Sequence, residues 1–226
     1  MRVLRLRPAL IGGALLLLLV GVAGIGALHS AAGRRLMVSL GIPCPVQDVS
    51  AAQVAQLREA GTRSLRGVQR APTKVALGME LGQSTRADLL AWSARSGAAC
   101  VELVRGYSYL RCRGVPASAL GAQGPALSEV WFSFAPDNRL IGVDLYRRGM
   151  DNASQVQAWN DARDRMAHDL GQPLRAVGDP SPAVLRASAL QTARLEYRYS
   201  DLLATLTAAN LPQAGLAVRE QYVLAN

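Results

Sequence analysis

A histidine and two aspartates recur at helical spacing near the middle of the second half of the chain, and residues of these types can bind a metal ion or transfer protons. Asp161, Asp164 and His168 are three and four positions apart, so a helix would place them on one face. There they could hold a metal, or the histidine could act as a base oriented by an acid. A solvent-exposed face explains them more simply, with ion pairs Asp161–Arg165 and Asp164–His168.

The helical wheel of this segment favours the solvent-exposed interpretation. The apolar residues share the opposite side of the wheel from the acids: Val156, Trp159, Met166 and Leu170. We expect these four to be buried against a sheet. The helix should run from 153 to 170, capped by Asp151 or Asn152 and ended by Gly171.

Further acidic and tyrosine side chains lie in segments typical of strands. The acids are Glu102, Glu129, Asp144 and Glu196, and the tyrosines are Tyr107, Tyr109, Tyr146 and Tyr222. Two of the acids could meet as a catalytic pair, although alternate strand positions that face water also explain them. The tyrosines could line a groove that forms a binding surface. The chain contains no G-x-G-x-x-G, G-x-S-x-G, H-E-x-x-H or C-x-x-C, so we predict no catalytic residue, no metal site and no cofactor.

Two of the three cysteines, Cys100 and Cys112, lie on either side of a glycine in a segment typical of a β-hairpin. With residues 105–107 as the loop, the antiparallel register puts the two cysteines directly opposite each other, with Cβ atoms about 4.5–5.5 Å apart. Small adjustments would then give disulfide geometry. Two buried free thiols are the alternative. We expect the disulfide, because the N-terminal sequence predicts export. We expect Cys44 to remain unpaired near the membrane, and an intermolecular bridge is the alternative.

An apolar run at residues 8–28 contains no charged side chain. Its length matches the roughly 20 residues that a helix needs to cross a bilayer, and we predict a retained transmembrane anchor. A cleavable signal peptide is the alternative, with the small residues 30–32 at the cleavage site. The arginines before and after the run slightly favour an N-terminus inside the cell. We expect a single-pass protein of the inner (cytoplasmic) membrane with a periplasmic C-terminal domain.

The positive charge of the chain is concentrated in its first third. The formal net charge is +9, and residues 1–74 supply most of it. The same residues contain no Phe, Trp or Tyr, which nucleic-acid-binding surfaces combine with basic side chains. A membrane surface explains the basic residues better, so we expect the lipid bilayer as a partner and no nucleic acid.

The remaining sequence predicts an α+β fold. A helix begins after Ser50, and a second begins at the capping signal Thr85–Asp88 and ends at Gly97. The hairpin at 99–113 and two strands joined by residues 135–138 follow, then the helix discussed above, a connector at 172–192 with a short helix after Pro182, and three strands. Helices and antiparallel strands are segregated in runs, which is typical of α+β proteins, and both halves resemble a helix followed by a meander.

These features divide the chain into three regions. We expect an N-terminal membrane anchor at residues 1–33, a basic juxtamembrane segment with a helix at 34–74, and an extracytoplasmic α+β domain at 75–226.

The segment LGMELGQSTRADLLAWSARSG, which precedes the predicted hairpin, resembles small periplasmic helix-on-sheet domains. These include the outer-membrane-assembly lipoprotein BamE and the β-lactamase inhibitor protein. The matching positions are Gly78, Met79, Thr85, Asp88, Leu89 and Gly97. This chain differs from the pattern in the residues 80–83 ahead of the cap and in lacking a lipidated cysteine. The resemblance implies protein binding rather than catalysis.

Two functions therefore follow from the sequence. The first is a membrane-anchored accessory or protein-binding module of the bacterial envelope, without catalytic activity, whose partner is another envelope protein. The second is an exported enzyme with an active site of scattered carboxylates and tyrosines. The absence of every standard nucleophile or metal motif favours the first.

Overall fold

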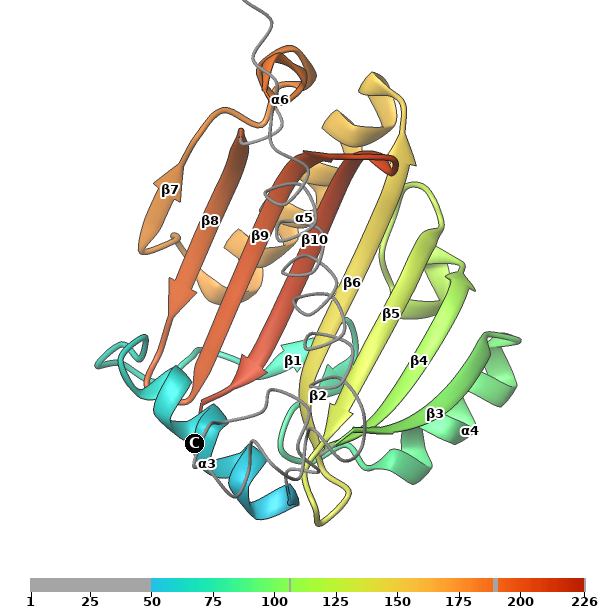
Figure 1. The fold of residues 1–226 in the computed structure, drawn as a ribbon, viewed down its shortest axis with the longest axis vertical. Helices are drawn as coiled ribbons and strands as arrows, with labels where there is room; N and C mark the ends of the chain where they lie inside the picture. The colour runs from blue at the N-terminus through green and yellow to red at the C-terminus, as the bar shows by residue number, and fades with distance from the viewer. Residues whose placement is uncertain (1–49, 106, 189–190, 226) are drawn as a thin grey trace, which may run out of the picture. The chain divides into compact units, whose positions relative to one another are not determined.

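The computed structural model describes residues 50–225 except 106, 189 and 190 (Figure 1). The helices are α3 Ala51–Arg63, α4 Arg86–Ser96, α5 Asn152–Leu170 and α6 Pro182–Ala187, with a 3-10 helix, η1, at Ala117–Leu120. The strands are β1 Val75–Ala76, β2 Met79–Glu80, β3 Ala99–Arg105, β4 Tyr107–Val115, β5 Leu127–Phe134, β6 Leu140–Met150, β7 Arg175–Val177, β8 Thr192–Arg198, β9 Leu202–Leu211 and β10 Gly215–Leu224.

Eight of these strands form one antiparallel sheet in the order β3-β4-β5-β6-β10-β9-β8-β7. The first meander, β3 to β6, follows α4 along the chain, and the second, β7 to β10, follows α5. The two meanders meet where β6 pairs with β10. β1 and β2 form a separate two-stranded sheet. The structure confirms the α+β class predicted from the sequence.

The second meander contains one strand that we did not predict. We expected residues 172–192 to form a connector with a short helix. The helix is present as α6, but β7 pairs with β8 ahead of it, with Ala176 opposite Leu195. All three residues of β7 are exposed, so the strand has no hydrophobic alternation that would reveal it.

Side-chain caps set the ends of the helices, as the sequence predicted. Thr85 Oγ1 accepts from the backbone N–H of Asp88 at 3.3 Å, and the Asp88 carboxylate accepts from the N–H of Thr85 at 2.8 Å. This reciprocal pair is a capping box for α4. Gly97 ends the same helix in the left-handed conformation, with φ 66°. Asp151 caps α5 by accepting from the N–H of Ser154 at 2.7 Å.

The hydrophobic core lies between one face of the sheet and the helices α4, α5 and α6, with α5 behind the strands in the view of Figure 1. α5 packs on β6, β9 and β10. Trp159 and Met166 are buried there, as predicted. From α4, the Trp92 ring meets Phe132 of β5 edge-to-face, with centroids 5.5 Å apart.

Two details of α5 differ from our expectation. Val156 is 42% exposed, because the buried face of the helix is centred on the small residues Ala158 and Ala162. Our prediction of the buried face considered only the large apolar residues. Asp161, which we expected to face solvent, is half-buried, because the loop containing Gly124 passes close to its carboxylate.

A buried ionic cluster joins α5 to the sheet. Glu220 of β10 is fully buried and accepts from Arg147 of β6 at 2.9 Å and from Arg165 of α5 at 2.5 Å. Arg147 also donates to the carbonyl of Pro125 at 3.2 Å. Arg165 thus pairs with Glu220 where we had predicted Asp161. The Tyr222 hydroxyl lies 3.4 Å from the same carboxylate, and burial raises its pKa.

α3 is attached to one end of the sheet. The Arg58 guanidinium donates to the carbonyls of Ile141 at 2.8 Å and Leu224 at 2.5 Å. The chain after α3 continues along the sheet, where the N–H of Gly67 donates to the carbonyl of Tyr199 at 3.2 Å.

Within the described residues, no helix combines the length and the apolar composition needed to cross a bilayer. The predicted membrane span at residues 8–28 and Cys44, which we expected to be unpaired, lie outside those residues. So do the whole of the predicted anchor region 1–33 and the first part of the region 34–74.

Candidate binding surface

Strand alternation gives the sheet two faces of different character. On β5, Val130, Phe132 and Phe134 are buried on the helical face, and the residues between them point the other way. α4, α5 and α6 all pack on the first face, and α3 lies at one end of the sheet. α3 covers Tyr107 at that end of the second face, and within the described residues no helix lies across the rest of this face. We call this second face the open face.

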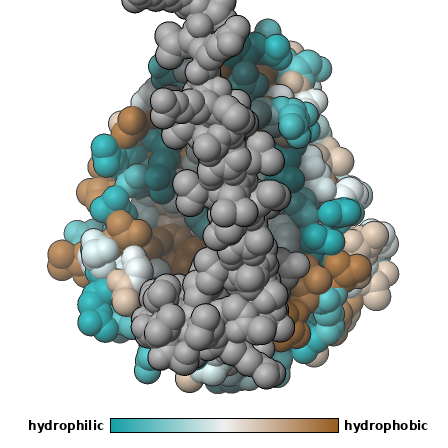
Figure 2. Space-filling model, in the orientation of Figure 1, coloured by the Kyte–Doolittle hydropathy of each residue, from teal (hydrophilic) through white to brown (hydrophobic). Residues whose placement is uncertain are grey.

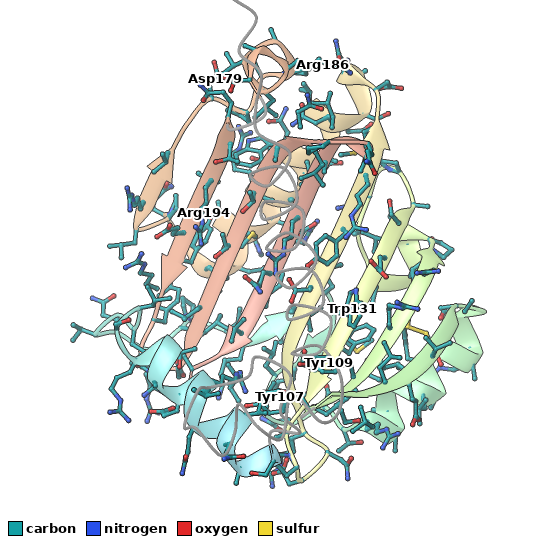
Figure 3. The ribbon with its side chains drawn as sticks, viewed as in Figure 1. Tyr107, Tyr109, Trp131, Asp179, Arg186 and Arg194 are labelled. Atoms are coloured by element: carbon teal, nitrogen blue, oxygen red, sulfur yellow. A yellow bond between two sulfur atoms is a disulfide. The ribbon has the colours of Figure 1, made fainter. Side chains whose placement is uncertain are left out.

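Three aromatic rings lie on neighbouring strands of the open face: Tyr109 of β4, Trp131 of β5 and Tyr146 of β6. The Tyr109 and Trp131 rings meet edge-to-face with centroids 6.0 Å apart. These rings, with Leu103, Ser133 and Asp144, line a shallow hollow of about 350 Å³. Figure 3 shows Tyr107, Tyr109 and Trp131 in sequence along this side of the sheet.

Arginines stack on these rings. The Arg111 guanidinium lies 5.4 Å from the centre of the Trp131 ring. Tyr146 lies under two guanidiniums, Arg148 at 4.5 Å and Arg219 at 5.2 Å. Such cation–π contacts are attractive, so the arginines stabilise the observed positions of the Trp131 and Tyr146 rings.

Each carboxylate of the open face that the sequence singled out is paired with arginine. Glu129 lies within 3.3–3.7 Å of the arginines 111, 113 and 148. Asp144 pairs with Arg219 at 2.6 Å. Glu196, on the other half of the sheet, pairs with the arginines 194 and 198 at 3.3 and 2.6 Å. Each of these carboxylates is thus engaged in ion pairs, and these contacts would have to be broken before the carboxylate could act as a general acid or base.

The fourth acid, Glu102 of β3, pairs with Arg86 of α4, on the side of the sheet that carries the helices. The structure does not bring it together with the other three acids. The hollow lined by the aromatic rings contains one carboxylate, that of Asp144. No pair of carboxylates within the described residues shares that hollow in the manner of an acid–base pair.

Burial raises the pKa of the hydroxyl groups of both Tyr109 and Tyr146. Both groups are therefore neutral at physiological pH, and each can donate or accept a hydrogen bond. The hollow thus offers apolar ring faces together with hydroxyl groups, a combination frequent at protein–protein contacts.

The four tyrosines predicted to form a binding surface lie in three different parts of the structure. Tyr109 and Tyr146 lie together in the hollow. Tyr107 touches Tyr109 at 6.4 Å between ring centroids but is buried, and it lines a cavity of about 350 Å³ with Arg58 and Thr62 of α3. Tyr222 is buried on the opposite face beside Glu220, because its strand position has the parity of the core.

Trp131 is the residue of the cluster that we did not predict from the sequence. In the segment SEVWFSFA it stands beside Phe132 and Phe134, which are both buried. Its position is out of phase with those two residues, and that alternation is a signal that could have identified it.

The histidine and aspartates considered first do not form a metal site. His168 is 88% exposed and contacts Asp169, while Asp164 pairs with Arg163 in place of His168. Among the described residues, no group of three or more potential ligands is arranged to hold a metal ion.

Comparisons of the chain with protein-family models, with curated proteins and with solved structures found no match.

Proposed function

We propose that this protein is a non-catalytic, membrane-anchored accessory module of the bacterial envelope, which binds an envelope protein on the open face of its sheet. The observation that carries the proposal is the aromatic cluster of Tyr109, Trp131 and Tyr146, which lies on the part of the open face that no helix covers among the described residues. Large, half-buried aromatic side chains are the residues that dominate binding energy at protein interfaces.

The expected compartment agrees with the bond between Cys100 and Cys112, whose sulfur atoms are 2.00 Å apart. Disulfides persist in oxidising compartments such as the periplasm. The apolar run at residues 8–28 accounts for export and for anchoring in the inner membrane, and the resemblance of residues 77–97 to periplasmic binding domains points to the same class of function.

The arginine-bound state of the open-face acids favours this proposal over the enzyme alternative. A general acid or base must exchange a proton during the reaction. Glu129 and Asp144 instead sit in ion pairs that would have to be broken first.

In-cell photocrosslinking tests the proposal. The photoreactive amino acid p-benzoylphenylalanine, incorporated in place of Tyr109 in the full-length chain, should give an adduct with a second protein. The same amino acid in place of Val156, exposed on α5, should give none. If Val156 gave the adduct and Tyr109 gave none, the partner would bind the helical face and the proposal would be wrong.

A further inference from the structure

The open face carries more positive than negative charge. Its arginines, read from strand parity and from the ion pairs above, are 111, 113, 148, 175, 194, 198 and 219. Its acids are 129, 144 and 196. Figure 2 views this side of the molecule and shows hydrophilic surface over β8.

Several of these arginines keep unused hydrogen-bond donors. Each guanidinium has five N–H donors, and Glu129 alone is shared among three of them. Arg113 is 67% exposed and lies 3.7 Å from Glu129, and Arg194 is 50% exposed and lies 3.3 Å from Glu196. Both guanidiniums therefore have donors directed to solvent and available to a partner. Arg194 lies on the other half of the sheet from Trp131 (Figure 3), so positive charge flanks the aromatic cluster.

We infer that the partner docks an acidic protein surface on the open face, with aspartate and glutamate carboxylates that pair with Arg113 and Arg194 around an apolar contact to Trp131. This inference rests on the proposed function and specifies the chemistry of the partner. Carboxylates match the guanidinium fork in geometry and charge, and complementary charge determines which partner is accepted.

The distribution of charges favours a protein over a polyphosphate chain. Glu129, Asp144 and Glu196 interrupt the arginines on the same face, and a uniformly negative chain would be repelled by each of them. A folded acidic surface carries its carboxylates at separate positions and can place neutral groups opposite these three acids.

Charge reversal in the crosslinking experiment tests the inference. The full-length chain with p-benzoylphenylalanine in place of Tyr109 is compared with the same chain carrying Arg113→Glu and Arg194→Glu. We expect the adduct yield to fall about tenfold or more, because like charges across an interface are strongly unfavourable. Arg113→Gln with Arg194→Gln should give a smaller loss. Arg186→Glu, on the exposed end of α6, is the matched control and should leave the yield unchanged.

The outcomes separate the inference from the proposed function. An adduct with equal yield in the charge-reversed and control chains would overturn the acidic partner and leave the proposed function standing. The absence of any adduct from Tyr109 would overturn both. An adduct with the mass of two copies, or one confined to this chain's own residues, would show that the face is occupied by the protein itself, and the inference would be wrong. The Cys100–Cys112 bond, checked in each variant by mass spectrometry, reports that the fold is intact.

Discussion

Cys100 lies directly opposite Cys112 in the β3–β4 ladder, and the two residues form a disulfide. The bond joins the edge strand of the sheet to its neighbour, with Cys112 fully buried. It therefore fixes β3 beside the strand that carries Tyr109.

Loss of this bond should destabilise the domain. Closing a loop of this length removes entropy from the unfolded chain, so replacement of both cysteines by alanine should lower the free energy of unfolding by about 3 kcal/mol. Urea denaturation of the full-length chain in detergent measures the change. Cys44→Ala is the control and should have no effect. Equal stability of the double variant and the control would contradict the prediction.

The buried ionic cluster predicts a second stability effect. Glu220→Gln leaves the guanidiniums of Arg147 and Arg165 in the core without a charged partner. Breaking a buried pair in this way costs about 3–5 kcal/mol, and the same denaturation experiment measures it. Asp164→Asn, which disrupts an exposed pair with Arg163, is the matched control and should cost less than about 1 kcal/mol. A small effect of Glu220→Gln would mean that the cluster is hydrated.

α5 offers a third pair of substitutions. Trp159 is 5% exposed against the sheet, and Trp159→Ala should lower the free energy of unfolding by about 3–5 kcal/mol through lost burial and the resulting cavity. His168→Ala should cost no more than about 0.5 kcal/mol, since its side chain is in solvent. It should also leave the crosslinking yield at Tyr109 unchanged. Loss of the adduct in a folded His168→Ala chain would require the acidic residues of α5 to be reconsidered as a functional site.

The helix caps predict how stability depends on acid pH. The N–H of Thr85 lowers the pKa of Asp88 below its ordinary value of 3.8. A carboxyl group whose pKa is lower in the folded state stabilises the fold above its unfolded pKa, and this contribution is lost as the pH falls through the folded value. The free energy of unfolding should therefore decrease as the pH is lowered below about 4. Asp88→Asn should make this decrease smaller. Denaturation curves at pH 7 and pH 3 for both chains measure this, and identical dependence in the two would contradict it.

The sequence predicted most of the fold because its local signals agreed with one another. The register that paired Cys100 with Cys112 is the observed one, and the caps at Thr85 and Asp151 begin the predicted helices. β7 was missed because its three residues have no buried side. Its only guide is pairing with Glu196 and its neighbours, which is a long-range property.

The candidate site was harder to predict, because a strand residue's face depends on which neighbours its strand has. Tyr109 and Tyr146, two of the four tyrosines predicted to line a groove, lie together in one hollow. Tyr222 does not lie with them, since the placement of β10 between β6 and β9 puts it under α5. The pairing of Arg165 with Glu220 likewise depends on how α5 lies across the sheet, and helical spacing alone favoured Asp161.

The most direct test of the central claim is the dissociation constant between the full-length chain and the partner recovered by crosslinking. Trp131→Ala should raise the dissociation constant about thirtyfold, the effect of losing an aromatic residue worth about 2 kcal/mol at an interface. Val156→Ala, on the helical side, should leave it unchanged. If Val156→Ala weakened binding while a folded Trp131→Ala chain bound as tightly as the unmodified protein, the open face would not be the binding surface.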